Sequence, residues 1–107
     1  MGVDVSLVAM QPVDVYCSGY THNVIPIARE AGIYEAIWRP EEIGIDTAGQ
    51  LIAPLEKGLK YLRENRERLL KLNPAIGWGD VDSFTVWVSD YLDGCREYPA
   101  AKVEVCR

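Results

Sequence analysis

The chain has 107 residues, of which 49% are hydrophobic and 25% are charged. This length suits one domain with its own core, and this composition argues against disorder along most of the chain. The formal net charge of −5 argues against nucleic acid or an anionic membrane as the main partner. We therefore expect a single domain over residues 1–107.

The N-terminal segment has the pattern of two strands. Residues 3–10 alternate between two faces, one of them fully apolar, as in a strand with one buried side. Gln11-Pro12 interrupts the alternation, because proline cannot donate to a strand ladder. The alternation resumes over residues 13–17 and should end at Gly19. This pattern predicts a hairpin or a bent pair of strands.

Short helices are expected after the two strands. Asn23 is a candidate N-cap, with Pro26 in the first turn, where its missing N–H is harmless. Apolar residues at helical spacing follow as far as Gly32, which is placed as a C-terminal stop. A second helical piece is expected over residues 33–37. A further turn is expected at residues 40–42, because their two acids suit a helix N-terminus.

A longer helix is predicted from Thr47, which forms a capping-box pattern with Gln50. Pro54 should bend this helix or begin its regular part. The helix runs to Leu72 or breaks near Asn65. Five leucines form one apolar stripe along it: Leu51, Leu55, Leu59, Leu62 and Leu69.

The C-terminal third is predicted as a loop, a helix and a strand. Residues 73–79 (NPAIGWG) form the clearest loop, and Asp80 should cap the helix that follows. The competing interpretation is a strand over residues 84–88, which favour extended structure locally. We prefer the helix because apolar residues recur at helical spacing over four turns. They are Val81, Phe84, Val88, Tyr91 and Cys95. Alternation over residues 101–105 predicts a final strand.

These elements predict an α+β domain of two layers. A small antiparallel sheet would combine the N-terminal strands with the C-terminal strand. Three to four helices would cover one face of this sheet, which buries all the apolar stripes at once.

The cysteines and the N-terminus indicate a cytoplasmic protein. Cys17, Cys95 and Cys106 have no CxxC spacing, so free thiols in a reducing compartment are the simplest interpretation. A bridge from Cys106 to Cys17 or to Cys95 is the alternative. No run of about 18 apolar residues could span a membrane. The N-terminus lacks the basic and then apolar layout of a signal peptide.

His22, the single histidine, is the main candidate for chemistry. A metal site would need further ligands, and only carboxylates and lone thiols without motif spacing are present, so we expect no metal and no cofactor. Paired with Asp80 or Cys17, His22 could serve a small hydrolase or lyase. No third orienting residue can be identified, so this remains the alternative hypothesis.

The segment Gly77-Trp78-Gly79-Asp80 is the main candidate for binding. Two glycines flank a tryptophan directly before a helix, so the loop can adopt positive φ and turn its amides toward a ligand. Asp80 would occupy the helix N-terminus, which disfavours a phosphate ligand. The structural interpretation is that Trp78 is a hydrophobic plug that fixes the loop against the sheet.

Positive charge is concentrated in one stretch. Residues 56–71 hold six basic and three acidic residues, which gives this stretch a net charge of +3. Because the whole chain has a net charge of −5, the remaining residues together carry −8. Such a strip could dock on the acidic face of another copy, which makes a homo-oligomer a third hypothesis. The alternative is a self-solvated helix, because three favourable i,i+4 pairs are present: Glu56–Lys60, Glu64–Arg68 and Glu67–Lys71.

Two motifs resemble a known group of proteins. The segment Tyr20-Thr21-His22-Asn23-Val24 and the Asn73-Pro74…Gly77-Trp78-Gly79 loop are similar to those of small hypothetical proteins of bacteria and their phages. The similarity extends from Tyr20 to Val105. The resemblance implies no activity, but it implies that the two segments act together.

The leading hypothesis is a non-enzymatic module that binds a small ligand or a protein. Its site would lie where the two loop segments meet at one end of the sheet. The candidate binding residues are Thr21, His22, Asn23, Trp78, Gly79 and Asp80.

Overall fold

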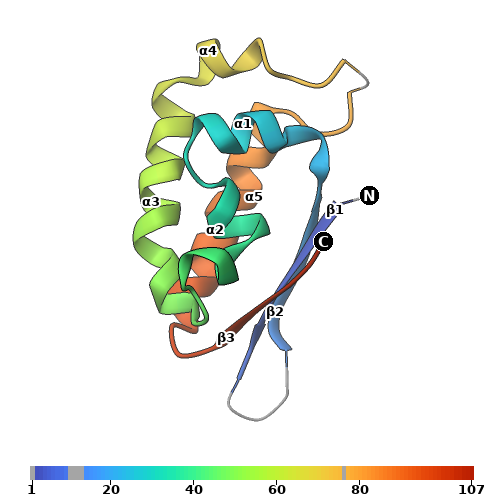
Figure 1. The fold of residues 1–107 in the computed structure, drawn as a ribbon. Coiled ribbons are helices and arrows are strands. Elements are labelled where there is room, and N and C mark those ends of the chain that lie inside the picture. The colour runs from blue at the N-terminus through green and yellow to red at the C-terminus, as the bar shows by residue number, and fades with distance from the viewer. Residues whose placement is uncertain (1, 10–13, 76) are drawn as a thin grey trace.

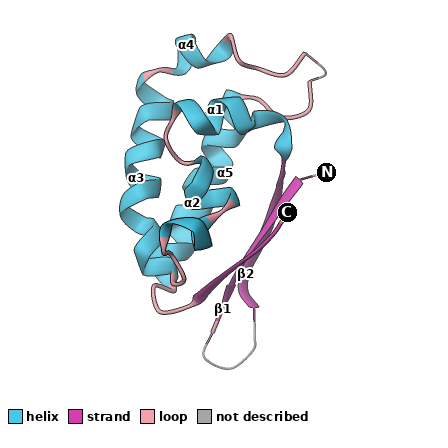
Figure 2. Ribbon diagram, in the orientation of Figure 1, coloured by secondary structure: helices cyan, strands magenta, loops and turns pink. Residues whose placement is uncertain are grey.

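The first and last strands of the chain meet in one antiparallel sheet. The computed structural model describes residues 2–9, 14–75 and 77–107. Its strands are β1 (Gly2–Val8), β2 (Asp14–Thr21) and β3 (Lys102–Cys106), in the order β2-β1-β3. The helices are η1 (His22–Val24), α1 (Ile25–Glu30), α2 (Tyr34–Trp38), η2 (Pro40–Ile43), α3 (Ala48–Glu64), α4 (Arg66–Leu70) and α5 (Val81–Glu97). They cover one face of the sheet, which confirms the two-layer α+β prediction (Figures 1 and 2).

β1 is the central strand and has the predicted alternation. Val3, Val5 and Leu7 are fully buried against the helices, whereas Asp4 between them is exposed. The antiparallel pairing of β1 with β2 confirms two paired N-terminal strands. The predicted interruption at Gln11-Pro12 lies outside the described residues.

β2 continues past Gly19 as far as Thr21, so the prediction that Gly19 ends the strand is wrong. The reason is the residue opposite it. Gly19 pairs with Asp4 of β1, and a Cβ on Gly19 would lie 2.4 Å from Asp4 Oδ1. Glycine at this position makes room for a carboxylate without ending the ladder.

The first helical segment begins earlier than predicted. Thr21 caps η1, with its hydroxyl accepting a hydrogen bond from the Asn23 backbone N–H at 3.3 Å. Asn23 is therefore inside the turn and is not the N-cap. α1 follows with Pro26 in its first turn, and Gly32 adopts φ +76° after its end, as the stop signal predicted.

α3 begins at the predicted capping box and passes through Pro54. Gln50 Oε1 accepts the Thr47 backbone N–H at 3.0 Å, which satisfies a donor at the helix start. The helix is regular from Ala48, so Pro54 does not begin its regular part. It ends before Asn65, whose side chain donates to the Tyr61 carbonyl at 3.0 Å. The break near Asn65 is thus confirmed.

α5 is a helix throughout, so the competing strand interpretation of residues 84–88 is wrong. Its inner face packs against the inward side chains of β2. Trp87 Nε1 donates to Ser18 Oγ at 2.9 Å. Gly94 lies so close to Tyr16 that a Cβ would be 3.0 Å from its ring. With a helical period, the apolar residues of this segment lie on one face that packs against both the core and β2. An extended segment would place alternate residues on opposite faces.

A test of the helix packing is Gly58→Ala in α3. A Cβ on Gly58 would lie 2.1 Å from Ile33 Cγ2. Alanine in a helix interior is favoured over glycine by about 1 kcal/mol, but overpacking a core costs roughly 1–3 kcal/mol. We expect the free energy of unfolding, measured by urea denaturation, to fall by about 1 kcal/mol. Adding Ile33→Ala should give a double-mutant cycle in which the two losses are less than additive. A stabilised Gly58→Ala variant would contradict this packing.

A second test concerns Tyr91, which is fully buried and whose hydroxyl has no hydrogen-bond partner among the described residues. Burial raises the pKa of Tyr91 well above its usual range. Tyr91→Phe should therefore leave the free energy of unfolding unchanged or raise it by about 1–3 kcal/mol. The unfolded chain ionises this tyrosine above pH about 10, whereas the folded chain keeps its proton. Wild-type stability thus falls as pH rises beyond that point, and the variant should show a smaller fall.

The matched control is Tyr61→Phe, which removes a hydroxyl that does donate, to Glu30 Oε2 at 3.3 Å. This variant should be no more stable than the wild type. Chemical denaturation at pH 8 and at pH 11 compares the variants. A Tyr91→Phe variant less stable than Tyr61→Phe would show that the Tyr91 hydroxyl has a partner.

Candidate functional site

The two segments singled out in the sequence lie side by side. The Asn23 side chain donates from Nδ2 to the backbone carbonyl of Trp78 at 3.2 Å. This bond joins the turn after β2 to the loop before α5, although the two residues are 55 positions apart. The loop is therefore held at the position of Trp78 by its backbone and not by its indole.

Gly79 shows how closely the loop packs on the end of β2. It adopts φ +85°, in the left-handed region that favours glycine. A Cβ there would lie 2.6 Å from Thr21 Cγ2 and 3.0 Å from Val24 Cγ1. Gly79 is thus a packing residue that allows the loop to approach the sheet, which is a different role from the predicted ligand contact.

Tyr20 joins the sheet to the first turn of α5. Its hydroxyl accepts the Asp80 backbone N–H at 3.4 Å and contacts the Ser83 hydroxyl. Its ring packs on Phe84 with centroids 5.5 Å apart. The sequence shows an aromatic residue near a strand end, but the pairing over more than sixty positions becomes visible only in the structure.

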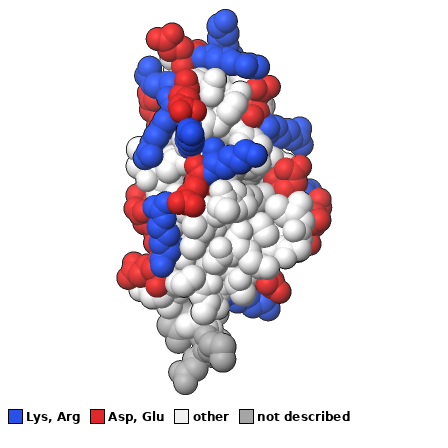
Figure 3. Space-filling view, turned by 90° about the vertical axis from the view of Figure 1, so that its left-hand side faces the viewer, with Lys and Arg blue, Asp and Glu red and all other residues white. Residues whose placement is uncertain are grey.

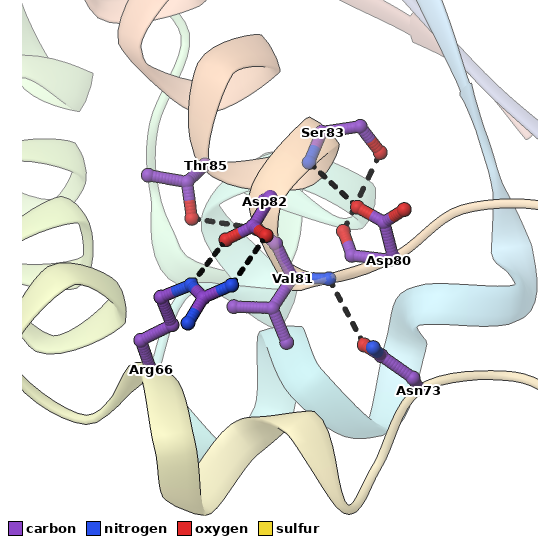
Figure 4. Close-up of polar contacts among 7 residues, drawn as sticks. All are labelled: Arg66, Asn73, Asp80, Val81, Asp82, Ser83 and Thr85. Atoms are coloured by element: carbon purple, nitrogen blue, oxygen red, sulfur yellow. Dashed lines mark hydrogen bonds and ion pairs between the residues drawn. The ribbon is translucent and has the colours of Figure 1, made fainter.

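Asp80 caps α5, as predicted (Figure 4). Its Oδ1 accepts the Ser83 backbone N–H at 2.7 Å. Beside it, Asn73 Oδ1 accepts the Val81 backbone N–H at 3.0 Å. Both bonds satisfy amides at the helix start and fix the C-terminal end of the loop. The Asp80 carboxylate is accordingly engaged in holding the helix.

The indole of Trp78 projects into solvent. Trp78 is 74% exposed, whereas Trp38 is 1% exposed and Trp87 is 8% exposed. The interpretation of Trp78 as a plug against the sheet is therefore wrong. The plug is not needed, because the Asn23 bond and the contacts of Gly79 already hold the loop.

Trp78 stands beside a surface hollow of about 590 Å³ at the end of the sheet's uncovered face. We call it the Trp78 hollow. Three of the predicted binding residues line it: Thr21, Asn23 and Trp78. Tyr20, which belongs to the same sequence segment, also lines it, and three residues that the sequence did not indicate complete it: Gly2, Asp4 and Gly19. The last three adjoin the others because Gly2 pairs with Thr21 across β1 and β2.

His22 does not line the Trp78 hollow. Its Nε2 atom is buried and has no hydrogen-bond partner in the described part of the chain. Its ring centroid lies 6.2 Å from that of Trp38, a core residue. Cys17 is exposed and accepts from Ser6 Oγ at 3.7 Å, on the outer face of the sheet. No hydrogen bond joins His22 to Asp80 or Cys17 among the described residues.

All three cysteines are free thiols, so neither of the bridges considered from the sequence is formed. Cys17 and Cys106 are exposed and Cys95 is buried. Burial raises the pKa of the Cys95 thiol to about 12. Within the described ranges, no group of three or more His, Cys, Asp and Glu side chains could hold a metal ion.

The ion pairs of the basic strip (residues 56–71) differ from the prediction, and they involve two of its six cations, Arg66 and Arg68. Figure 3 shows Lys and Arg side chains interleaved with Asp and Glu on the face that carries α3. The ion pairs reach across elements: Arg96 with Glu56 at 2.7 Å, Arg66 with Asp82 at 2.7 Å and Arg68 with Glu30 at 3.5 Å. The expected i,i+4 pairs are absent from the ion pairs of the described residues, partly because α3 ends at Glu64. A mixed surface of this kind is a weak candidate for binding anions.

Thiol reactivity tests this assignment of the cysteines. A disulfide reagent such as DTNB at pH 8 should titrate the two exposed thiols rapidly and the buried one only after unfolding. Cys95→Ala should leave the rapid phase unchanged, whereas Cys17→Ala should halve it. A rapid phase that contains all three thiols would show that Cys95 is accessible in the native state.

The comparisons with known proteins identify no relative of this chain. In the described residues no helix is both long enough and apolar enough to cross a membrane. No family model, no curated protein and no solved structure matches the chain. Any conclusion about function therefore rests on the chemistry of the site itself.

Proposed function

We propose that this protein is a non-enzymatic binding module whose ligand site is the Trp78 hollow. One observation supports this most: Trp78 is 74% exposed on a loop whose backbone is fixed by Asn23. The ligand is a small molecule or a side chain of a protein partner. The hollow supplies an aromatic wall and convergent polar groups, as ligand sites commonly do.

A fixed and exposed tryptophan favours binding for an energetic reason. Ordering a loop on association costs free energy, and here intramolecular hydrogen bonds already hold Trp78 and Asp80 in place. The indole can then bury apolar area against a ligand at little further cost. Tryptophan is also the residue type most often found to dominate binding energy at interfaces.

The enzymatic alternative, a hydrolase or lyase that uses His22, has less support. The Asp80 carboxylate already accepts a hydrogen bond as the cap of α5. The buried Nε2 of His22 faces the core beside Trp38 and not the Trp78 hollow. A general base needs hydrogen-bond reach to a substrate proton, which this orientation does not offer.

A reducing cytoplasm is part of the proposal. The exposed thiols of Cys17 and Cys106 support it, because exposed cysteines in an oxidising compartment are commonly bridged. Self-association through the basic strip receives less support, because its cations alternate with acids (Figure 3).

Trp78→Ala is the central test. A fragment library with neutral, anionic and cationic members should include compounds that shift the NMR signals of the Trp78 indole N–H and the Gly19 amide. In Trp78→Ala the affinity for these compounds should fall by at least about tenfold, as for an interface hot spot. The thermal midpoint should stay within about 3 °C, because a mostly exposed side chain is removed.

The matched control is Val86→Ala, which truncates another exposed apolar residue, 60% exposed on α5 and outside the Trp78 hollow. It should retain the affinity of the wild type. Fragments that bind Trp78→Ala as tightly as the wild type, or a library without any compound at this site, would overturn the proposal.

A further inference from the structure

The Trp78 hollow has a specific charge character. Among its lining residues Asp4 is the single charged side chain, and Trp78 is the largest aromatic surface. Thr21 and Asn23 add a hydroxyl and an amide. No lysine, arginine or histidine is among its described lining residues, so an anion would find no cationic side chain among them.

The Asp4 carboxylate has no cationic partner in the described chain. Of the sixteen acids in the sequence, six form the ion pairs of the described residues, and Asp4 is not among them: Glu30, Glu41, Glu42, Glu56, Asp82 and Asp93. The cross-strand neighbours of Asp4 are Gly19 on β2 and Cys106 on β3, and neither residue type is cationic. Asp4 is also exposed, so its charge can be neutralised by a ligand.

Glycines make the floor of the hollow flat. The Asp4 carboxylate lies over Gly19, where a Cβ would be 2.4 Å from Oδ1. Gly2 lies equally close to the neighbouring strand, with a Cβ position 2.3 Å from the Tyr20 carbonyl oxygen. Neither position has a side chain that would stand above the sheet. A planar group can therefore approach the carboxylate along the backbone.

On the basis of the proposed function, we infer that the Trp78 hollow binds an alkylguanidinium group. The guanidinium pairs with the Asp4 carboxylate and stacks on the Trp78 indole. A guanidinium is planar and cationic, it donates two parallel hydrogen bonds to a carboxylate, and it stacks on aromatic rings. An ammonium group supplies the charge but neither the plane nor the paired donors. A divalent metal ion would need more oxygen ligands than one carboxylate supplies.

The net charge of the protein supports this choice. With a net charge of −5, the protein as a whole attracts cations and disfavours acidic partners. The source of the guanidinium is an arginine side chain of a polypeptide or a free arginine derivative. Both present the same group to the same two residues.

The test compares three capped peptides and one small molecule by NMR titration. The peptides are acetyl-Gly-Arg-Gly-amide, its citrulline analogue and its lysine analogue, and the small molecule is agmatine. Citrulline keeps the shape of arginine but is neutral. The arginine peptide should bind at least about fivefold more tightly than the citrulline peptide and more tightly than the lysine peptide. Tighter binding of the arginine peptide than of agmatine indicates a polypeptide source, and the reverse order indicates a small molecule.

Variants separate the two contacts. Asp4→Asn should reduce the affinity for the arginine peptide to that for the citrulline peptide, and Trp78→Ala should weaken both. Glu104→Gln is the matched control, because it removes one negative charge from an exposed residue on the same face of the sheet, outside the hollow. It should retain the wild-type preference for arginine. Dispersed amide spectra confirm that each variant is folded.

Two results would overturn the inference. One is equal affinity for the arginine and citrulline peptides, and the other is an unchanged preference in Asp4→Asn. If neutral fragments still bind beside Trp78 in either case, the proposed ligand site is retained and the inference of a guanidinium ligand is wrong. If no compound binds beside Trp78, both proposals fall.

Discussion

The packing of α5 against β2 is the contact on which the rest of the structure depends. Trp87 donates to Ser18, and Tyr16 packs against Gly94. The ring of Tyr20 packs against both Phe84 and Trp87. These contacts fix the helix along the edge strand of the sheet. They also determine where the helix begins, because the Tyr20 hydroxyl accepts the Asp80 backbone N–H. The loop before α5 is thereby brought to the end of β2.

That constraint explains why two distant segments form one surface. Once the start of α5 is tied to Tyr20, the residues just before it must pass over the neighbouring turn. The tight approach of Gly79 to Thr21 and the bond from Asn23 to the Trp78 carbonyl follow from this position. Asn73 holds the first amide of the helix from the other end of the loop. These contacts hold the loop at Trp78 and Gly79 without using the Trp78 side chain.

Much of the fold could be predicted because local patterns and tertiary packing agree. The period of two in β1, the capping box at Thr47 and the cap at Asp80 each mark an element that the structure contains. Predictions went wrong where a tertiary contact overrides a local signal. Gly19 suggests a strand end, but the opposing carboxylate of Asp4 accounts for it. Asn23 has the chemistry of an N-cap, but its side chain bonds to a loop 55 residues away.

The candidate site was predictable only in part, for a related reason. Thr21, Asn23 and Trp78 belong to motifs that are visible in the sequence, and all three line the Trp78 hollow. His22 lies between two of them, but its Nε2 atom is buried on the core side. Asp4 was missed because it reads as an ordinary outward residue of an alternating strand. The register of β1 on β2 places it opposite Gly19, in the same hollow that Trp78 lines.

The exposure of Trp78 has an energetic meaning. Fully burying a large apolar side chain typically stabilises a fold by about 1.5–3 kcal/mol, and this chain forgoes most of that gain at Trp78. It does so although both other tryptophans are buried. Gly77 and Gly79 adopt positive φ on either side of it, so the loop accepts two glycine conformations to present the indole outward. A domain of 107 residues has a small net free energy of unfolding, so the stabilisation forgone at Trp78 is a substantial fraction of it. The outward Trp78, which lines the same hollow as Asp4, supports the proposal of a ligand site there, because binding would recover apolar burial that folding leaves unused.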